Sequence, residues 1–285
     1  MKWRLALLCC IIPVTVLAEE ARSTDITPFI FKNEVNPPVD GKGGAWQPLR
    51  GWGEIRFPSS EQLDDNDNLI VEGAFNKDVI LRNYSSTFVV KAFGSVNYVS
   101  DTEGFDFNNK LRPAVGVALQ YYPFSGIVVE NGIKYELDYR LRTQRTLHGG
   151  QFFTNWFAGW NLPFFDSLKK RNTAFPGFTW GGVRYPGSQD DEEESNIIVE
   201  GAVEQGVDWY HTDAVTINSY IELKYIADKE EYSYNNHVTF SVGSKLRIPI
   251  GNEITFQPGV KYSVNKRFLS GKVREDTIFF VNWFF

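Results

Sequence analysis

The sequence contains almost no cysteine. Its two cysteines, Cys9 and Cys10, both lie in the first 18 residues, so the rest of the chain has none. A disulfide framework and a thiolate metal site are therefore excluded for residues 19–285. The three histidines, His148, His211 and His237, do not have the spacing of metal ligands, and we expect neither a metal ion nor a cofactor.

Long apolar runs are also scarce. The longest, 5–17, follows the positive residues Lys2 and Arg4 and is followed by a small residue, Ala18. This layout is typical of a secretory signal peptide, and the run is short for a membrane anchor. We therefore predict a signal peptide over residues 1–18. The rest of the chain contains no apolar stretch of the length that a transmembrane helix needs.

Positive charge is in short supply. Loss of residues 1–18 leaves 27 of the 29 basic residues against 35 acidic residues, a net charge of about −8. A chain with this balance offers no basic face for phosphates, so nucleic acid is not an expected partner. Five consecutive acidic residues at 190–194 are expected to be solvated, with binding of divalent cations shared with lipopolysaccharide as the alternative.

The chain instead shows a regular two-residue alternation. In the run 127–141, one face carries apolar residues and the other carries Glu130, Lys134, Glu136, Asp138 and Arg140. A β-strand sends successive side chains to opposite faces, so this run predicts a strand with one apolar and one charged face. Runs of this length exceed the usual strand of a soluble sandwich, about 5–6 residues, and fit tilted strands that cross an outer membrane.

The pattern predicts an all-β fold, a single antiparallel transmembrane β-barrel in the bacterial outer membrane. We assign residues 19–45 to an irregular N-terminal segment and residues 46–285 to the barrel. Twelve strands are expected, at 46–57, 68–81, 86–99, 110–122, 127–140, 149–160, 176–186, 196–210, 214–227, 236–248, 253–264 and 276–285. The run at 68–81 alternates poorly. An even count is what bacterial single-chain barrels require.

Connection lengths support this count. If the N-terminus is periplasmic, the long connections at 58–67, 100–109, 187–195, 227–235 and 265–275 face outward, and short turns at 123–126, 211–213 and 249–252 face the periplasm. The exception is 161–175, which is long on the periplasmic side. It indicates either a short periplasmic helix around 164–171 or a strand count that is wrong by one hairpin.

The last predicted strand carries an aromatic end. Phe279, Val281, Trp283 and Phe285 share one face, and this pattern resembles the C-terminal assembly signal of outer-membrane barrels. We expect this face to contact outer-membrane lipid and the barrel-assembly machinery to recognise it. Tryptophans within or at the ends of strands are expected at the membrane interfaces, namely Trp156, Trp160, Trp180, Trp209 and Trp283.

Charged residues on the polar faces form the candidate site. They are Arg112, Glu130, Lys134, Glu136, Asp138, Arg140, Glu200, Glu204, Asp208, Glu222, Lys224, Lys245, Arg247 and Lys261. One interpretation is a salt-bridge network that fills a narrow barrel, and the other is a polar pore for a hydrophilic substrate. A barrel of this size lies between filled small barrels and open porins, so both interpretations stay open.

A catalytic site is not expected. His237 and Ser241 share a strand face, and some barrels that cleave lipids use serine and histidine. Four residues along a strand separate the two side chains too far for a direct hydrogen bond. We therefore expect a non-enzymatic barrel. A lipid- or lipopolysaccharide-modifying enzyme is the alternative hypothesis.

Part of the chain resembles a known family. The stretch 111–124 (LRPAVGVALQYYPF), followed by GIKY at 132–135, resembles the C-terminal barrel domain of bacteriophage adsorption protein A and of related exopolysaccharide-export barrels. The resemblance implies a non-enzymatic outer-membrane barrel linked to surface polysaccharide export or surface interaction, with envelope polysaccharide or phage as candidate partners. A passive small-solute porin or a structural barrel is a further alternative.

Overall fold

The computed structural model describes residues 45–57, 68–85, 87–102, 109–124, 126–161, 174–188, 195–231, 235–251 and 254–285. The predicted signal peptide, the N-terminal segment up to residue 44, the acidic run 190–194 and the stretch 164–171 lie outside these residues. Among the described residues, no helix is long and apolar enough to cross a membrane.

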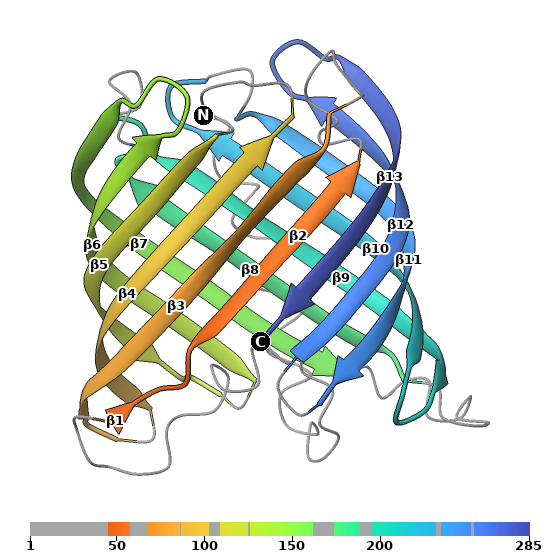
Figure 1. Ribbon diagram of the computed structural model, residues 1–285, viewed down its shortest axis with the longest axis horizontal. Coiled ribbons are helices and arrows are strands. Elements are labelled where there is room, and N and C mark those ends of the chain that lie inside the picture. Colours follow the sequence, from red (N-terminus) through yellow and green to blue (C-terminus); the bar gives the residue numbers. More distant parts are fainter. Residues whose placement is uncertain are drawn as a thin grey trace.

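The described chain forms one closed antiparallel sheet (Figure 1). From β2 onward each strand pairs with its neighbours in sequence, and β13 returns to pair with β2, so the sheet is closed. The strands are β1 (Ala45–Trp46), β2 (Arg50–Phe57), β3 (Ile70–Asn83), β4 (Phe88–Asp101), β5 (Lys110–Tyr121), β6 (Ile127–Arg140), β7 (Thr146–Asn161), β8 (Pro176–Tyr185), β9 (Ile198–His211), β10 (Thr216–Asp228), β11 (His237–Ile250), β12 (Ile254–Arg267) and β13 (Val273–Phe284).

The first predicted strand, 46–57, is interrupted. Both β1 and β2 pair with β3, so together they occupy one position in the wall and the barrel has twelve strands. Trp46 is in register with Val79 and Arg50 with Asn76, which places four steps of one chain against three of the other. The extra residue falls beside Pro48, which has no N–H to donate to the ladder. The predicted fold class is confirmed.

The two ends of the barrel differ in their connections. The end that holds the C-terminus (Figure 1) has short turns at 84–87, 122–126, 212–215 and 251–253, as expected of a periplasmic end. The long connection 162–175 joins β7 to β8, so the strand count was not wrong by a hairpin.

The connection expected at 265–275 was too long. β12 and β13 remain paired up to Lys266 and Val273, which leaves only residues 268–272 between the strands. On the outer face of this extension the hydroxyl of Tyr262 donates a hydrogen bond to Glu275. These strand ends carry polar residues on their outer face, and for that reason the sequence predicted the strands to be too short. An extracellular extension of a strand does not have to face lipid, so polar residues can point outward there.

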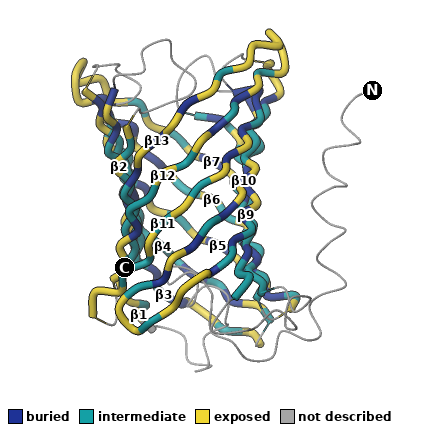
Figure 2. Tube along the Cα trace, turned by 90° about the vertical axis from the view of Figure 1, so that its right-hand side faces the viewer, coloured by how far each residue is buried: buried dark blue, intermediate teal, exposed yellow. Residues whose placement is uncertain are grey.

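Burial alternates along the strands (Figure 2), and its polarity is the reverse of that in a soluble barrel. Large apolar side chains are exposed on the outer face, among them Val115, Ile133, Phe152, Ile221, Phe240 and Phe279. Buried polar and charged side chains line the interior, among them Asp78, Lys91, Glu136, Asp208 and Glu222. A closed sheet with a lipid-compatible exterior satisfies all its backbone groups inside a bilayer. The protein is therefore an outer-membrane β-barrel.

Alternate residues at the C-terminal end of the barrel, Phe279, Trp283 and Phe285, lie on the outer face. Phe279 is exposed, and the ring of Trp283 covers Gly53 so closely that a Cβ there would lie 2.2 Å from the indole. Phe285 covers Gly51 in the same way and lies 5.6 Å, centroid to centroid, from Phe75. Glycines in β2 thus make room for the aromatic rings of the last strand.

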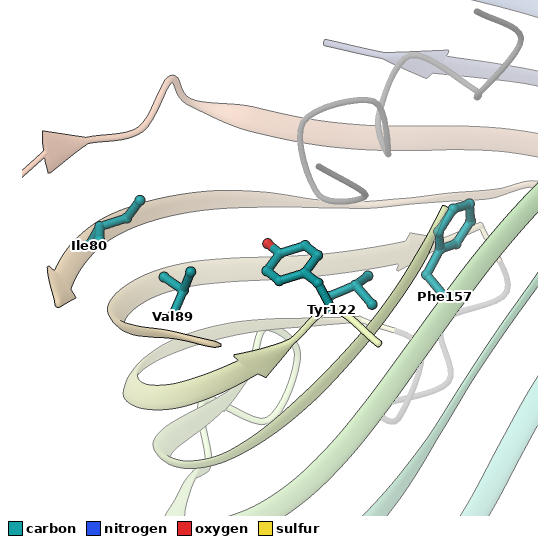
Figure 3. Close-up of a cluster of buried hydrophobic side chains, with 5 residues drawn as sticks. Ile80, Val89, Tyr122 and Phe157 are labelled. Carbon is teal, nitrogen blue, oxygen red and sulfur yellow. The ribbon is translucent and has the colours of Figure 1, made fainter. Parts of the chain in front are cut away.

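A small apolar cluster lies inside the barrel towards the periplasmic end (Figure 3). It comprises Ile80, Val89, Tyr122, Val128 and Phe157, with Phe178 and Trp180 packed against it. Apolar residues on the inner face of β3, together with a bulge after Ile80, explain why 68–81 alternates poorly in sequence.

Candidate functional site

The inner wall of the barrel is the candidate site. The strand alternation and register place all fourteen predicted charged residues on this wall, distributed over β5, β6 and β9 to β12. Side-chain contacts then group them into separate clusters, as follows.

One cluster spans five strands, β2 to β6, near the periplasmic end. Asp78 of β3 accepts from Arg50 at 2.5 Å and from Lys91 at 2.9 Å. The ammonium group of Lys91 also lies 2.6 Å from Glu130, which accepts from Gln120 at 2.8 Å. Of these charged residues, sequence analysis identified only Glu130. Asp78 was missed because β3 has apolar residues on its inner face and a bulge after Ile80, so its sequence does not show which residues point inward.

Small residues of β5 allow this cluster to form. Lys91 is in register with Ala118, yet it reaches Glu130 on β6, one strand further on. Next to it, the ring of Phe93 lies over Gly116, where a Cβ would approach the ring to 2.6 Å. The alternation of alanine and glycine on the inner face of β5 thus lets long side chains of β4 cross it.

Three carboxylates are each shared between two cations. These triads are Glu136 with Lys134 (2.5 Å) and Arg112 (3.9 Å), Asp138 with Arg140 (3.0 Å) and Lys110 (3.9 Å), and Glu222 with Lys224 (3.5 Å) and Lys261 (3.8 Å). In each triad the carboxylate is almost fully buried. Lys110 was not among the predicted residues, because it begins its strand beside a predicted loop.

Other inner charges form simple pairs. Lys245 lies 2.7 Å from Glu204, Arg247 pairs with Asp208, and Glu200 pairs with Arg184, which was not among the predicted residues. Lys245 also lies 4.4 Å from the centroid of the Tyr220 ring. The reverse ratio, two carboxylates on one cation, occurs among the described ion pairs at Arg56, which contacts Glu54 at 2.7 Å and also Glu72.

Aromatic rings stand among these charges. Phe93 and Phe153 meet edge to face at 5.8 Å, over Gly116 and Gly132. Trp180 is also inside, packed against the apolar cluster, so its predicted place at a membrane interface is wrong. The reason is the phase of β8. Its outward positions include Gly177 and Gly181, which are covered by Trp160 and Trp156 of β7.

The histidine and serine of the alternative enzyme hypothesis do not form a lipid-facing pair. Ser241 is fully buried in the interior, and its hydroxyl lies 2.9 Å from that of Ser263. His237 is also buried on the inner wall. Within the described ranges, no group of three or more histidine, cysteine, aspartate or glutamate residues is placed to hold a metal ion.

Buried amides fix the extracellular end of the wall. Asp228, at the end of β10, accepts from Asn236 at 2.8 Å, from Asn235 at 2.9 Å and from Asn196 at 3.2 Å. Asp101 and Asn109 are joined similarly at 3.0 Å across the connection from β4 to β5. Sequence analysis missed both groups because their residues fall at predicted loop boundaries.

The chain was compared with known families, curated proteins and solved structures. No protein-family model and no curated protein matches the sequence. Among solved structures, the β domain of the Bordetella autotransporter BrkA is similar at a TM-score of 0.41 and 11% identity, over 85% of this chain and 98% of that one. An outer membrane channel from Pseudomonas putida F1 gives 0.42 and 8%, over 87% and 99%. LpxR from Salmonella typhimurium gives 0.40 and 6%, over 83% and 99%.

Proposed function

We propose that the protein is a non-enzymatic barrel whose lumen carries a hydrophilic glycan chain across the outer membrane, as in surface polysaccharide export. The observation that supports this proposal is the composition of the inner wall, where charged side chains still reach water. Arg112, Arg184, Glu200 and Lys224 all face inward and remain partly accessible, unlike the buried residues around them. A wall that served only as filling would leave such long charged side chains without solvent.

The mixture of groups on the wall suits a sugar chain. Carbohydrates present hydroxyls, which bond to charged and amide groups, and apolar ring faces, which pack on aromatic rings. The inner wall offers both, with accessible charged side chains such as Arg112 and Lys224 and aromatic rings such as Phe93. Strong mutual pairing of the charges also prevents any single group from holding the chain too tightly to release it.

Planar-bilayer recording on the purified protein tests the proposal. We expect discrete conductance steps, together with liposome swelling in small sugars that slows as the sugar length increases. A barrel that never conducts would refute the conduit. Free passage of sugars of every size tested, without any effect of glycan chains on the current, would indicate a passive porin instead.

A second candidate function, surface interaction, rests on the β12–β13 hairpin. Phe268 and Leu269 in its turn and Val273 at the start of β13 are all about half exposed. Solvent-exposed apolar residues on an extracellular hairpin are typical of a docking surface for a protein such as a phage tail tip. Phe268→Ser with Leu269→Ser should abolish adsorption of any phage that requires this barrel, with unchanged barrel content in the membrane. Normal adsorption would remove this candidate.

A further inference from the structure

We infer that the lumen prefers anions, so that the glycan it carries is an acidic one, bearing carboxylate or other negatively charged groups. This inference rests on the proposed function and names the substrate class of the same site. The overall charge of the chain predicts the opposite preference, because the protein has a net charge of −6.

The ion-pair groups of the lumen differ in their ratio of cations to carboxylates, and most of the unbalanced ones have more cations. Each of the three triads around Glu136, Asp138 and Glu222 contains two cations and one carboxylate, and so carries one surplus positive charge. The group around Arg56 carries one surplus negative charge, and the cluster of Arg50, Asp78, Lys91 and Glu130 is balanced. The described ion pairs of these groups therefore sum to two surplus positive charges, while Asp101 and Asp228, two further acids of the wall, are buried among amides at its extracellular end.

The paired side chains of the triads also differ in how accessible they are from the lumen. The side chain of Arg112 is 35% exposed and that of its partner Glu136 only 3%. The side chain of Lys224 is 41% exposed, against 9% for Glu222. In these two triads the carboxylate thus lies against the wall and the cationic side chain projects into the lumen, whereas Glu200 and Glu72 are about as accessible as their partners Arg184 and Arg56. A solute that passes the triads meets their positive ends first, and the field of a confined pore acts mainly through its nearest charges.

The triads lie on two opposite sides of the barrel wall. Two triads lie on β5 and β6, and the third lies on β10 and β12, around β11. β5 and β11 are six positions apart in either direction around the closed sheet, so the two cationic surfaces lie on opposite walls. A polyanion threading the barrel would therefore meet positive charge on both sides. Neutral sugars would lack this interaction.

The test is the reversal potential of the full-length protein in a planar bilayer under a KCl gradient. We expect the wild type to pass Cl⁻ in preference to K⁺. Arg112→Gln combined with Lys224→Gln should lower the permeability ratio by about twofold or more, because both changes remove charge at the pore surface. Glu72→Gln, which removes an accessible carboxylate, should raise the ratio. Lys77→Gln removes one positive charge from the outer face and should leave the ratio unaltered.

The outcomes separate the two proposals. A conducting barrel that prefers K⁺, or an effect of Lys77→Gln as large as that of the double variant, would overturn the anion preference and leave the conduit intact. A folded barrel without conductance would overturn the conduit. In that case binding decides the inference: alginate hexamer should change the tryptophan fluorescence of the detergent-solubilised wild type, with weaker binding by the double variant. Equal binding of maltohexaose and alginate hexamer, or no binding of either, would overturn it.

Discussion

The Lys91 bridge provides the sharpest test of what stabilises the interior. Its ammonium group joins Asp78 at 2.9 Å to Glu130 at 2.6 Å, and its side chain is only 7% exposed. Lys91→Met keeps the side chain as far as the atom before the ammonium nitrogen and removes the charge. Asp78 would then keep Arg50 as a cationic partner, whereas Glu130 would keep the neutral amide of Gln120.

The expected cost follows from that asymmetry. Breaking a buried ion pair by removing one partner costs about 3–5 kcal/mol, because the other charge remains desolvated. Glu130 is partly accessible to water, so its unpaired charge costs less than a fully buried one. We therefore expect the free energy of unfolding to fall by about 3 kcal/mol, the lower end of that range. Adding Glu130→Gln removes the stranded charge and should recover roughly 1–2 kcal/mol.

Equilibrium unfolding in urea with lipid vesicles, followed by tryptophan fluorescence, measures these differences. Lys224→Met is the control, because its side chain is water-accessible and lies 3.5 Å from its partner. We expect it to cost less than about 1 kcal/mol. If Lys91→Met and Lys224→Met cost the same, or if Glu130→Gln brings no recovery, the bridge does not stabilise the barrel in the way argued.

Further predictions concern the outer face and the extracellular end. Val281→Lys places a charge on the lipid side, at a cost of up to about 4 kcal/mol depending on depth, and should reduce the folded protein in outer-membrane fractions; normal insertion would mean that the assigned facing is wrong. Gly53→Ala drives a methyl group into the ring of Trp283 and should cost about 1–3 kcal/mol in urea unfolding, whereas Gly150→Ala, with open space around it, should be neutral. Asp228→Ala leaves buried amides without their acceptor; a loss of about 1–3 kcal/mol and faster hydrogen exchange at the ends of β9 and β11 are expected, and unchanged exchange would contradict the role of this group.

The strand pattern was predictable wherever each face of a strand had one kind of neighbour. On β6, lipid lies outside and charged partners lie inside, so alternation in sequence reports the facing directly. β3 was harder because its inner face carries Ile70, Ala74 and Ile80 beside Asp78, and the bulge after Ile80 shifts the phase. The prediction for Trp180 was wrong for a similar reason, because an aromatic residue suits either the membrane interface or an apolar cluster inside the barrel.

The partners within the candidate site were beyond prediction. Which charges face inward follows from alternation, but which ones meet depends on the register between strands. Lys91 and Glu130 meet across β5 only because Ala118 lies between them. That relation requires three strands to be in place at once, and no spacing along the chain encodes it.

The pairing of β13 with β2 has a consequence for how the barrel is made. It is the shortest junction between neighbouring strands of the wall, with six residue pairs against thirteen for β3 and β4. The other junctions join strands that are consecutive in the sequence, so they can form as local hairpins. This one joins the two ends of the folded region, and until it forms the sheet has two edges with unpaired backbone groups, which a bilayer does not tolerate. β13 must therefore be present before the barrel can close, and a chain without β13 would remain an open sheet even though its other hairpins could form.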